Sequence, residues 1–92
     1  MSEEVEEVEE EREYTVPLQR AWISPRGKRV PKAVRMLREF IRRHMKSDSV
    51  SISPEVNEAL WRRGIEKPPR RIRVRAVKDK EGRVTVYLAE GG

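Results

Sequence analysis

The segment RRIRVRAVKDKEGRVTVYL, residues 70–88, contains the pattern that decides the fold. Apolar and charged residues alternate over residues 71–76, and apolar and polar residues alternate again over residues 83–88. A period of two is typical of strands that bury one face. The residues KDKEG between these stretches end in Gly82 and are short enough to close an antiparallel hairpin. The segment therefore predicts two paired strands.

Two helices are predicted on the N-terminal side of this hairpin. Ser53, Pro54 and Glu55 are typical of a helix start, because they supply an N-cap, a proline at the first position and a favourably placed acid. Together with a stop at Gly64, they predict a short helix over residues 54–63. A longer helix is predicted over residues 31–46, where apolar residues recur at intervals of three and four.

Two more strands are expected. Every second residue from Tyr14 to Leu18 is apolar, which predicts a strand over residues 13–20. Pro17 has no N–H to donate, and this places the strand at an edge of the sheet. A short strand is also expected over residues 50–52, between the two helices.

An extended basic loop is predicted over residues 21–32. Its sequence AWISPRGKRVPK has two prolines, one glycine and four cations without a sustained period, and Trp22 and Ile23 are its expected apolar anchors. The complete order of elements predicts a single α+β domain over residues 14–90. In it a small mixed sheet of edge strand, short strand and C-terminal β-hairpin packs against one long and one short helix. A chain of 92 residues suffices for one such domain.

The first thirteen residues differ sharply in composition from the rest. Residues 1–13 contain eight glutamates and one arginine, with only Val5 and Val8 as apolar residues. Such a segment buries too little apolar surface to repay its ordering entropy, so a disordered acidic tail is expected. Two roles are open for it: covering the basic surface to suppress wrong contacts, or offering a docking strip to a basic partner.

The remainder of the chain is strongly cationic, and its cations gather in two segments. Over the whole sequence 21 cations face 16 acids, whereas residues 26–46 and 62–75 together hold sixteen cations and only two acids, Glu39 and Glu66. One-signed fields of this density are typical of polyanion sites. Arginine dominates, and its planar fork suits the phosphates and bases of folded RNA. The predicted RNA-binding residues are Arg26, Lys28, Arg29, Lys32, Arg35, Arg38, Arg42, Arg43, Lys46, Arg62, Arg63, Lys67, Arg70, Arg71, Arg73 and Arg75.

Residues for catalysis or metal binding are not apparent. The sequence has no cysteine and one histidine, which excludes thiolate and multi-histidine metal sites. His44 falls in the apolar stripe of the predicted long helix, so a packed, hydrogen-bonded histidine is expected there. We therefore expect no enzyme activity, cofactor or metal. No apolar run approaches the roughly 18 residues of a membrane span, so no membrane partner is expected and the cytosol is the expected compartment.

Three stretches resemble a known family: YTVPLQRAW (14–22), RGKRVPKAVRMLREFIRRHMK (26–46) and SPEVNEALWRRGIEKPPRRIRVRAVKDKEG (53–82). They are similar to the archaeal and eukaryotic large-subunit ribosomal protein thirty-one family, and the likeness extends over residues 14–88. The most specific pieces are VNEALWRRGIEKPPRRIRVR, residues 56–75, and the helix start PKAVR, residues 31–35. The glutamate-rich N-terminal segment is not part of the shared pattern.

This resemblance implies a small α+β protein that binds ribosomal RNA (rRNA) on the outside of the large subunit, near the rim of the polypeptide exit tunnel. The implied partners are large-subunit rRNA, neighbouring ribosomal proteins and factors that meet nascent chains, and the free protein is expected to be a monomer. The implied location is the cytoplasm, within the ribosome. The family's basic positions carried over to this chain are Arg29, Lys32, Arg35, Arg38, Arg42, Arg43, Arg62, Arg63, Lys67, Arg70, Arg71, Arg73 and Arg75.

Two other functions fit the same elements less well. Helix, short helix and hairpin also predict a winged-helix DNA-binding regulator. Its recognition helix would need polar side chains that discriminate base edges, and the second helix offers Asn57, Glu58 and two arginines near its end. A basic nuclease or RNA-modifying enzyme would need carboxylates or a nucleophile that the sequence does not bring together.

Overall fold

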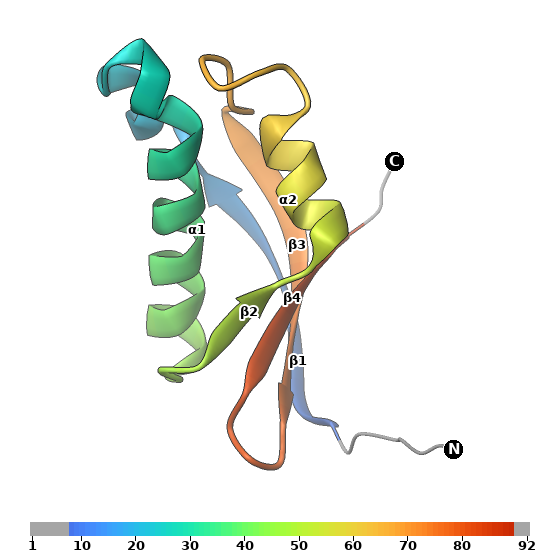
Figure 1. The fold of residues 1–92 in the computed structure, drawn as a ribbon. Coiled ribbons are helices and arrows are strands. Elements are labelled where there is room, and N and C mark those ends of the chain that lie inside the picture. Colours follow the sequence, from blue (N-terminus) through green and yellow to red (C-terminus); the bar gives the residue numbers. More distant parts are fainter. Residues whose placement is uncertain (1–7, 90–92) are drawn as a thin grey trace.

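The computed structural model describes residues 8–89 of the chain. Two α-helices, two short 3-10 helices (η) and four strands make up the domain (Figure 1). Their bounds are β1 Val8–Pro17, η1 Gln19–Ile23, η2 Arg26–Lys28, α1 Arg29–Met45, β2 Val50–Ile52, α2 Pro54–Trp61, β3 Arg71–Asp79 and β4 Val84–Leu88. The predicted α+β class, with a small mixed sheet and one long and one short helix, is confirmed.

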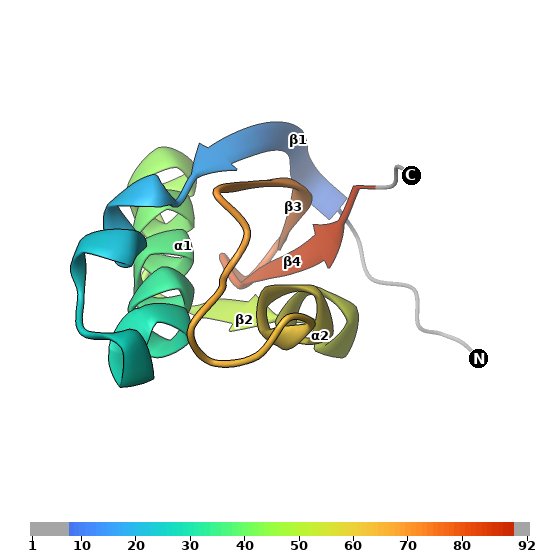
Figure 2. The same ribbon diagram turned by 90° about the horizontal axis from the view of Figure 1, so that it is seen from above.

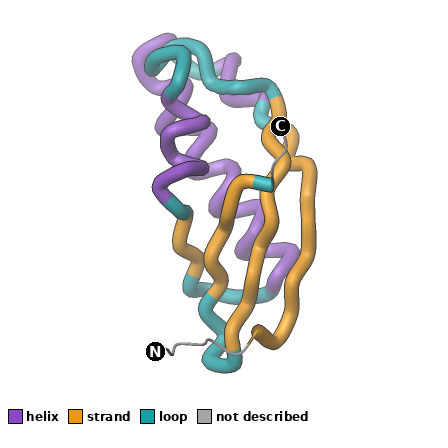
Figure 3. The backbone as a smooth tube through the Cα atoms, turned by 90° about the vertical axis from the view of Figure 1, so that its right-hand side faces the viewer, coloured by secondary structure: helices purple, strands orange, loops and turns teal. Residues whose placement is uncertain are grey.

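The four strands form one sheet in the order β1-β3-β4-β2. β3 pairs antiparallel with both β1 and β4, whereas β2 pairs parallel with β4. The predicted C-terminal hairpin therefore forms the centre of the sheet, and β1 is an edge strand as predicted. Figure 3 views the sheet from the side opposite α1, so that the strands lie in front and the long helix lies behind them. The sheet thus has an inner face toward the helices and an outer face without them.

The core lies between the inner face and the two helices. In α1 the buried residues recur every three or four positions, and in β3 and β4 every second residue is buried, as the sequence patterns predict. Leu37, near the middle of α1, has no exposed surface. The buried apolar side chains form one cluster made of Val16, Leu18, Ala21, Val30, Ala33, Leu37, Ile41, Met45, Val56, Leu60, Ile72, Val74, Ala76, Val84 and Val86.

The hairpin turn is closed by one carboxylate and one glycine. Asp79 Oδ1 accepts hydrogen bonds from the backbone N–H groups of Glu81 and Arg83, each at 2.9 Å. Gly82 adopts a positive φ of 87°, a conformation that side chains with a Cβ rarely take. The sequence KDKEG thus folds as the predicted short connection. On β3, Arg71, Arg73 and Arg75 alternate with buried residues and therefore lie on the outer face.

The prediction of a disordered tail over residues 1–13 is wrong for residues 8–13. These residues form the first part of β1, which pairs with β3 from Val8 opposite Asp79 to Pro17 opposite Arg71. The backbone hydrogen bonds of this ladder and the arginines on β3 give the glutamates partners that composition alone does not reveal. Residues 1–7 of the predicted tail lie outside the described residues.

The prediction of an extended loop over residues 21–32 is also wrong. This segment contains part of η1, all of η2 and the start of α1 at Arg29. It is ordered by distant contacts, because the Trp22 indole N–H donates to the carbonyl oxygen of Pro68 at 3.1 Å. Ile23, an expected anchor, is instead 83% exposed.

His44 lies beside the buried stripe of α1 and not within it. The stripe passes from Ile41 to Met45, and His44 is exposed. Its ring stacks on Phe40 with centroids 4.0 Å apart, and its Nδ1 lies 2.8 Å from the carbonyl oxygen of Phe40. Tyr14 from β1 packs edge-on against both rings, at 5.6 Å from Phe40 and 5.4 Å from His44. These aromatic rings join the edge strand to the long helix.

Candidate nucleic-acid interface

Two segments that are distant in the sequence meet at one end of the molecule. Backbone hydrogen bonds join Leu18 N to Arg70 O at 2.7 Å and Val30 N to Ile65 O at 3.1 Å. Figure 2 shows the connection from α2 to β3 passing beside η1, η2 and the start of α1. We call residues 19–32 and 62–71 the basic end.

The basic end carries an almost purely positive charge. It contains ten cations and a single acid, Glu66. Within residues 8–89 none of these ten cations forms an ion pair with a carboxylate. Nine of the ten are predicted RNA-binding residues, and Arg20 is the one that the sequence analysis missed, because it was assigned to the end of the first strand. The ten cations are Arg20, Arg26, Lys28, Arg29, Lys32, Arg62, Arg63, Lys67, Arg70 and Arg71.

Trp22 organises part of this end. Beyond its hydrogen bond to Pro68, its ring centre lies 5.0 Å from the guanidinium carbon of Arg29 and 4.3 Å from that of Arg70. Arg29 also donates to two backbone carbonyls, from Nε to Ser24 at 3.2 Å and from Nη1 to Glu66 at 3.3 Å. Arg29 therefore holds the two segments together, whereas Arg70 is exposed. Two like charges kept beside one ring, with no carboxylate partner among residues 8–89, form an arrangement suited to an anion.

Replacing Trp22 with phenylalanine is expected to lower the free energy of unfolding by about 1 kcal/mol. A smaller aromatic ring replaces the indole, and the N–H that reaches the Pro68 carbonyl is lost. Urea denaturation of the two proteins measures the difference. Ile23→Ala is the matched control, because a side chain that is 83% exposed should change stability by less than about 0.5 kcal/mol. Equal stability of Trp22→Phe and the parent would show that this hydrogen bond does not fasten the segment.

A second group of cations follows the exposed face of α1. Arg35, Arg38, Arg43 and Lys46 are exposed and form no ion pair with any acid among the described residues. They extend the positive surface from the basic end along the helix axis. Arg43 also lines a shallow groove with Arg20 and Lys32, between β1 and α1.

Arg42 differs from its neighbours on this face, because an acid neutralises it. Its guanidinium donates to both carboxylate oxygens of Glu39, with Nη2 2.7 Å from Oε2. Asp48 lies 3.7 Å away on another side of the guanidinium. This hydrogen bonding, with the attraction between the charges, lowers the pKa of Glu39 and raises the pKa of Arg42. Of the predicted RNA-binding cations on α1, Arg42 is the one that a carboxylate of the described chain already binds.

Two further predicted cations lie apart from both groups, on the outer face of the sheet. Arg73 Nη2 is 3.5 Å from Glu13 Oε1, and Arg75 Nη1 is 3.1 Å from Glu11 Oε2. Arg71 precedes them on β3 and belongs to the basic end, next to Gln19 and Arg70. The structure thus brings most of the sixteen predicted residues onto one continuous end and helix face, and it gives Arg73 and Arg75 acidic partners.

Metal binding and membrane insertion find no support in the described part of the chain. Among residues 8–89, no three His, Asp or Glu side chains come together in a way that could hold a metal ion. No helix in this part has the length and apolar character needed to cross a bilayer. The basic end and the α1 face are therefore the candidate functional surface.

Comparison with known proteins bears on what this surface is for. Residues 9–83 match a family model described as Ribosomal protein L31e. The chain belongs to the L31e family of ribosomal proteins. This confirms the resemblance found in the sequence and favours a ribosomal protein over the winged-helix regulator. The L31e family is not an enzyme family, and its members work in the cytoplasm, within the ribosome.

Similar L31e proteins come from several archaea. The chain is 58% identical over 84 residues to "Large ribosomal subunit protein eL31" of Methanopyrus kandleri, which covers 91% of this chain and 98% of that protein. It is 51% identical over 80 residues to the protein of the same name from Methanothermobacter thermautotrophicus, covering 87% and 99%. For Hyperthermus butylicus the identity is 49% over 78 residues, covering 82% and 78%.

Proposed function

We propose that this chain is a structural protein of the large ribosomal subunit that binds rRNA through its basic end and the exposed face of α1. The relatives are named as proteins of that subunit. The observation that carries the proposal is the charge of the basic end, where ten cations face one acid and none is paired with a carboxylate in the described chain.

The chemistry of these side chains suits a folded RNA. Arginine forks bind phosphate oxygens through two parallel hydrogen bonds, and each neutralised phosphate releases condensed counterions. The cations of α1 continue the surface in rows, which suits a phosphate backbone. Aromatic rings are few on this surface, and Trp22 is occupied by two arginines, so recognition rests on the shape and phosphates of the RNA.

The proposed location and neighbours of the protein are those that the family resemblance implies. The protein lies near the rim of the polypeptide exit tunnel, beside neighbouring ribosomal proteins, and offers surface to factors that meet nascent chains. The free protein is a monomer, because its cations repel a second copy until RNA neutralises them.

Sedimentation of a native lysate tests this function directly. The protein should migrate with large subunits at low salt and remain there at moderate salt, as expected of a stoichiometric component held by many phosphate contacts. A chain that stays at the top of the gradient as a small free protein would contradict the proposal. If the protein left the subunit at slightly raised salt, its attachment would be non-specific and electrostatic, which would also contradict the proposal.

A further inference from the structure

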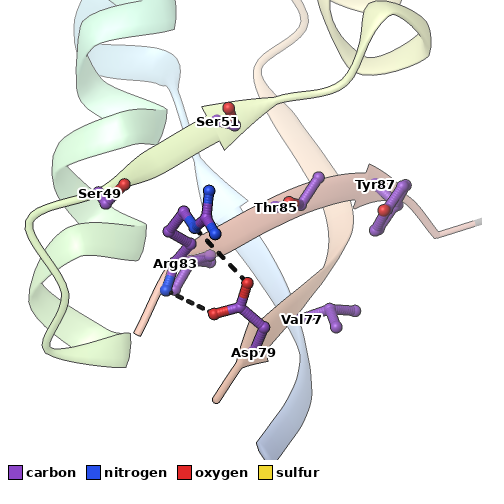
Figure 4. A pocket seen from close by; sticks show the side chains of 8 residues that line it. Ser49, Ser51, Val77, Asp79, Arg83, Thr85 and Tyr87 are labelled. Atoms are coloured by element: carbon purple, nitrogen blue, oxygen red, sulfur yellow. Dashed lines mark hydrogen bonds and ion pairs between the residues drawn. The ribbon is translucent and has the colours of Figure 1, made fainter. Parts of the chain in front are cut away.

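The outer face of the sheet has a different charge from the basic end. Beyond Arg71, β1 and β3 place there the cations Arg73 and Arg75 and the acids Glu11, Glu13 and Asp79. At the turn, Asp79 contacts Arg83 (Figure 4). Glu81 forms a further ion pair with Arg83. On this face acidic residues accompany the cations, whereas the basic end contains almost no acidic residues.

The pairing between β1 and β3 is specific in its geometry. Glu13 lies opposite Arg75 in the register, yet its carboxylate contacts Arg73, and Glu11 lies opposite Val77, yet it contacts Arg75. Each carboxylate therefore contacts the arginine that lies two residues before its directly paired residue on β3. Arg75 is fixed further by Tyr87 on β4, whose ring centre lies 5.0 Å from its guanidinium carbon. Two arginines are thus each matched to one glutamate.

These paired side chains remain open to solvent. The exposed fraction is 65% for the Arg73 side chain and 38% for that of Arg75. An RNA strand could therefore approach them, and only their partners distinguish them from the cations of the basic end. At physiological ionic strength charges are screened over about 8 Å, so a phosphate near either arginine also meets the carboxylate beside it. The attraction is then largely cancelled, and fewer counterions are released.

We propose that Glu11 and Glu13 are specificity determinants that withhold Arg73 and Arg75 from RNA and confine phosphate binding to the basic end and the α1 face. The inference rests on the proposed function and adds which face of the protein RNA does not contact. It also gives the described half of the acidic segment a role, because the glutamates of this segment neutralise arginines of β3.

The test is the double substitution Glu11→Gln and Glu13→Gln, with poly(U) as a nonspecific RNA. Two freed arginines should steepen the plot of log affinity against log salt by about 1.4, or roughly 25-fold in affinity at about 0.1 M salt. Adding Arg73→Ala and Arg75→Ala should return the slope to that of the parent. Fluorescence anisotropy across a range of KCl concentrations measures all three proteins, and thermal denaturation confirms that each is folded.

The matched control is Glu9→Gln with Glu55→Gln. It removes the same two charges from exposed positions, and neither acid forms an ion pair with another residue in the described chain. An equal gain in this control would overturn the inference, because net charge and not the pairing would then be the cause. So would an unchanged slope in the Glu11 and Glu13 variant. If the parent protein binds neither rRNA nor poly(U), the proposed function itself fails, which is a separate outcome.

Discussion

Replacing Leu37 with alanine is expected to lower the free energy of unfolding by about 2–5 kcal/mol. The side chain has no exposed surface and lies in the middle of the buried stripe of α1. Its loss would leave a cavity in the core between the helices and the inner face of the sheet. A domain of this size has a total stability of roughly 5–14 kcal/mol, so the variant should unfold at a much lower urea concentration.

The control for this prediction is the next residue of the same helix. Arg38 is exposed, so Arg38→Ala should change the free energy of unfolding by less than about 0.5 kcal/mol. Both variants are measured by urea denaturation under the same conditions. If Leu37→Ala unfolded at the same urea concentration as the parent while Arg38→Ala unfolded at a lower one, α1 would present the opposite face to the sheet.

Neutralising three cations of the basic end should weaken rRNA binding by roughly 100- to 500-fold at about 0.1 M salt. The variant combines Arg26→Gln, Lys28→Gln and Lys67→Gln, all at exposed positions without a carboxylate partner in the described chain. Each lost phosphate contact should flatten the salt slope by about 0.7–0.9. Binding to purified large-subunit rRNA, titrated over a range of salt concentrations, gives both quantities.

A charge-matched variant separates surface from net charge in this experiment. Arg12→Gln, Lys80→Gln and Arg83→Gln remove the same three positive charges from positions outside the basic end and the α1 face. This variant should keep nearly all of the salt slope. If the two triple variants lost affinity equally, rRNA would be attracted by the overall charge of the protein and not by the proposed surface.

Elements with strong local patterns could be predicted from the sequence. The apolar stripe of α1 and the alternation in β3 and β4 depend only on near neighbours, and the predicted helix over residues 31–46 differs little from Arg29–Met45. The hairpin follows from a turn that its own residues close, with Asp79 and Gly82 in the required places. In these segments the local preference and the tertiary structure agree.

The first half of β1 could not be predicted, because its partners are far away in the sequence. Arg73 and Arg75 follow the glutamates that they contact by 60 and 64 residues. A glutamate-rich segment has low strand propensity, and composition alone favours disorder. The segment around Trp22 was mistaken for an extended loop for the same reason, since the carbonyl that orders it belongs to Pro68.

For the candidate surface, the cations could be identified from the sequence. Whether each cation is engaged by other residues of the chain could not. Arg29 carries part of the structure, and Arg73 and Arg75 pair with β1, which only the fold determines. The pairing of Arg42 is an exception, because Glu39 precedes it by three residues and such neighbours meet on a helix. That spacing was a signal available in the sequence.

The strand order has a consequence for how this protein is made. Both edge strands, β1 and β2, depend on partners that are synthesised later, since β1 pairs with β3 and β2 pairs with β4. No two strands can therefore pair until β3 has been released, and the complete sheet needs β4, which ends at Leu88. Contacts between such distant segments also make folding slow compared with that of a helical bundle. Until β3 is released, Glu11 and Glu13 have none of the arginines that they contact in the folded domain.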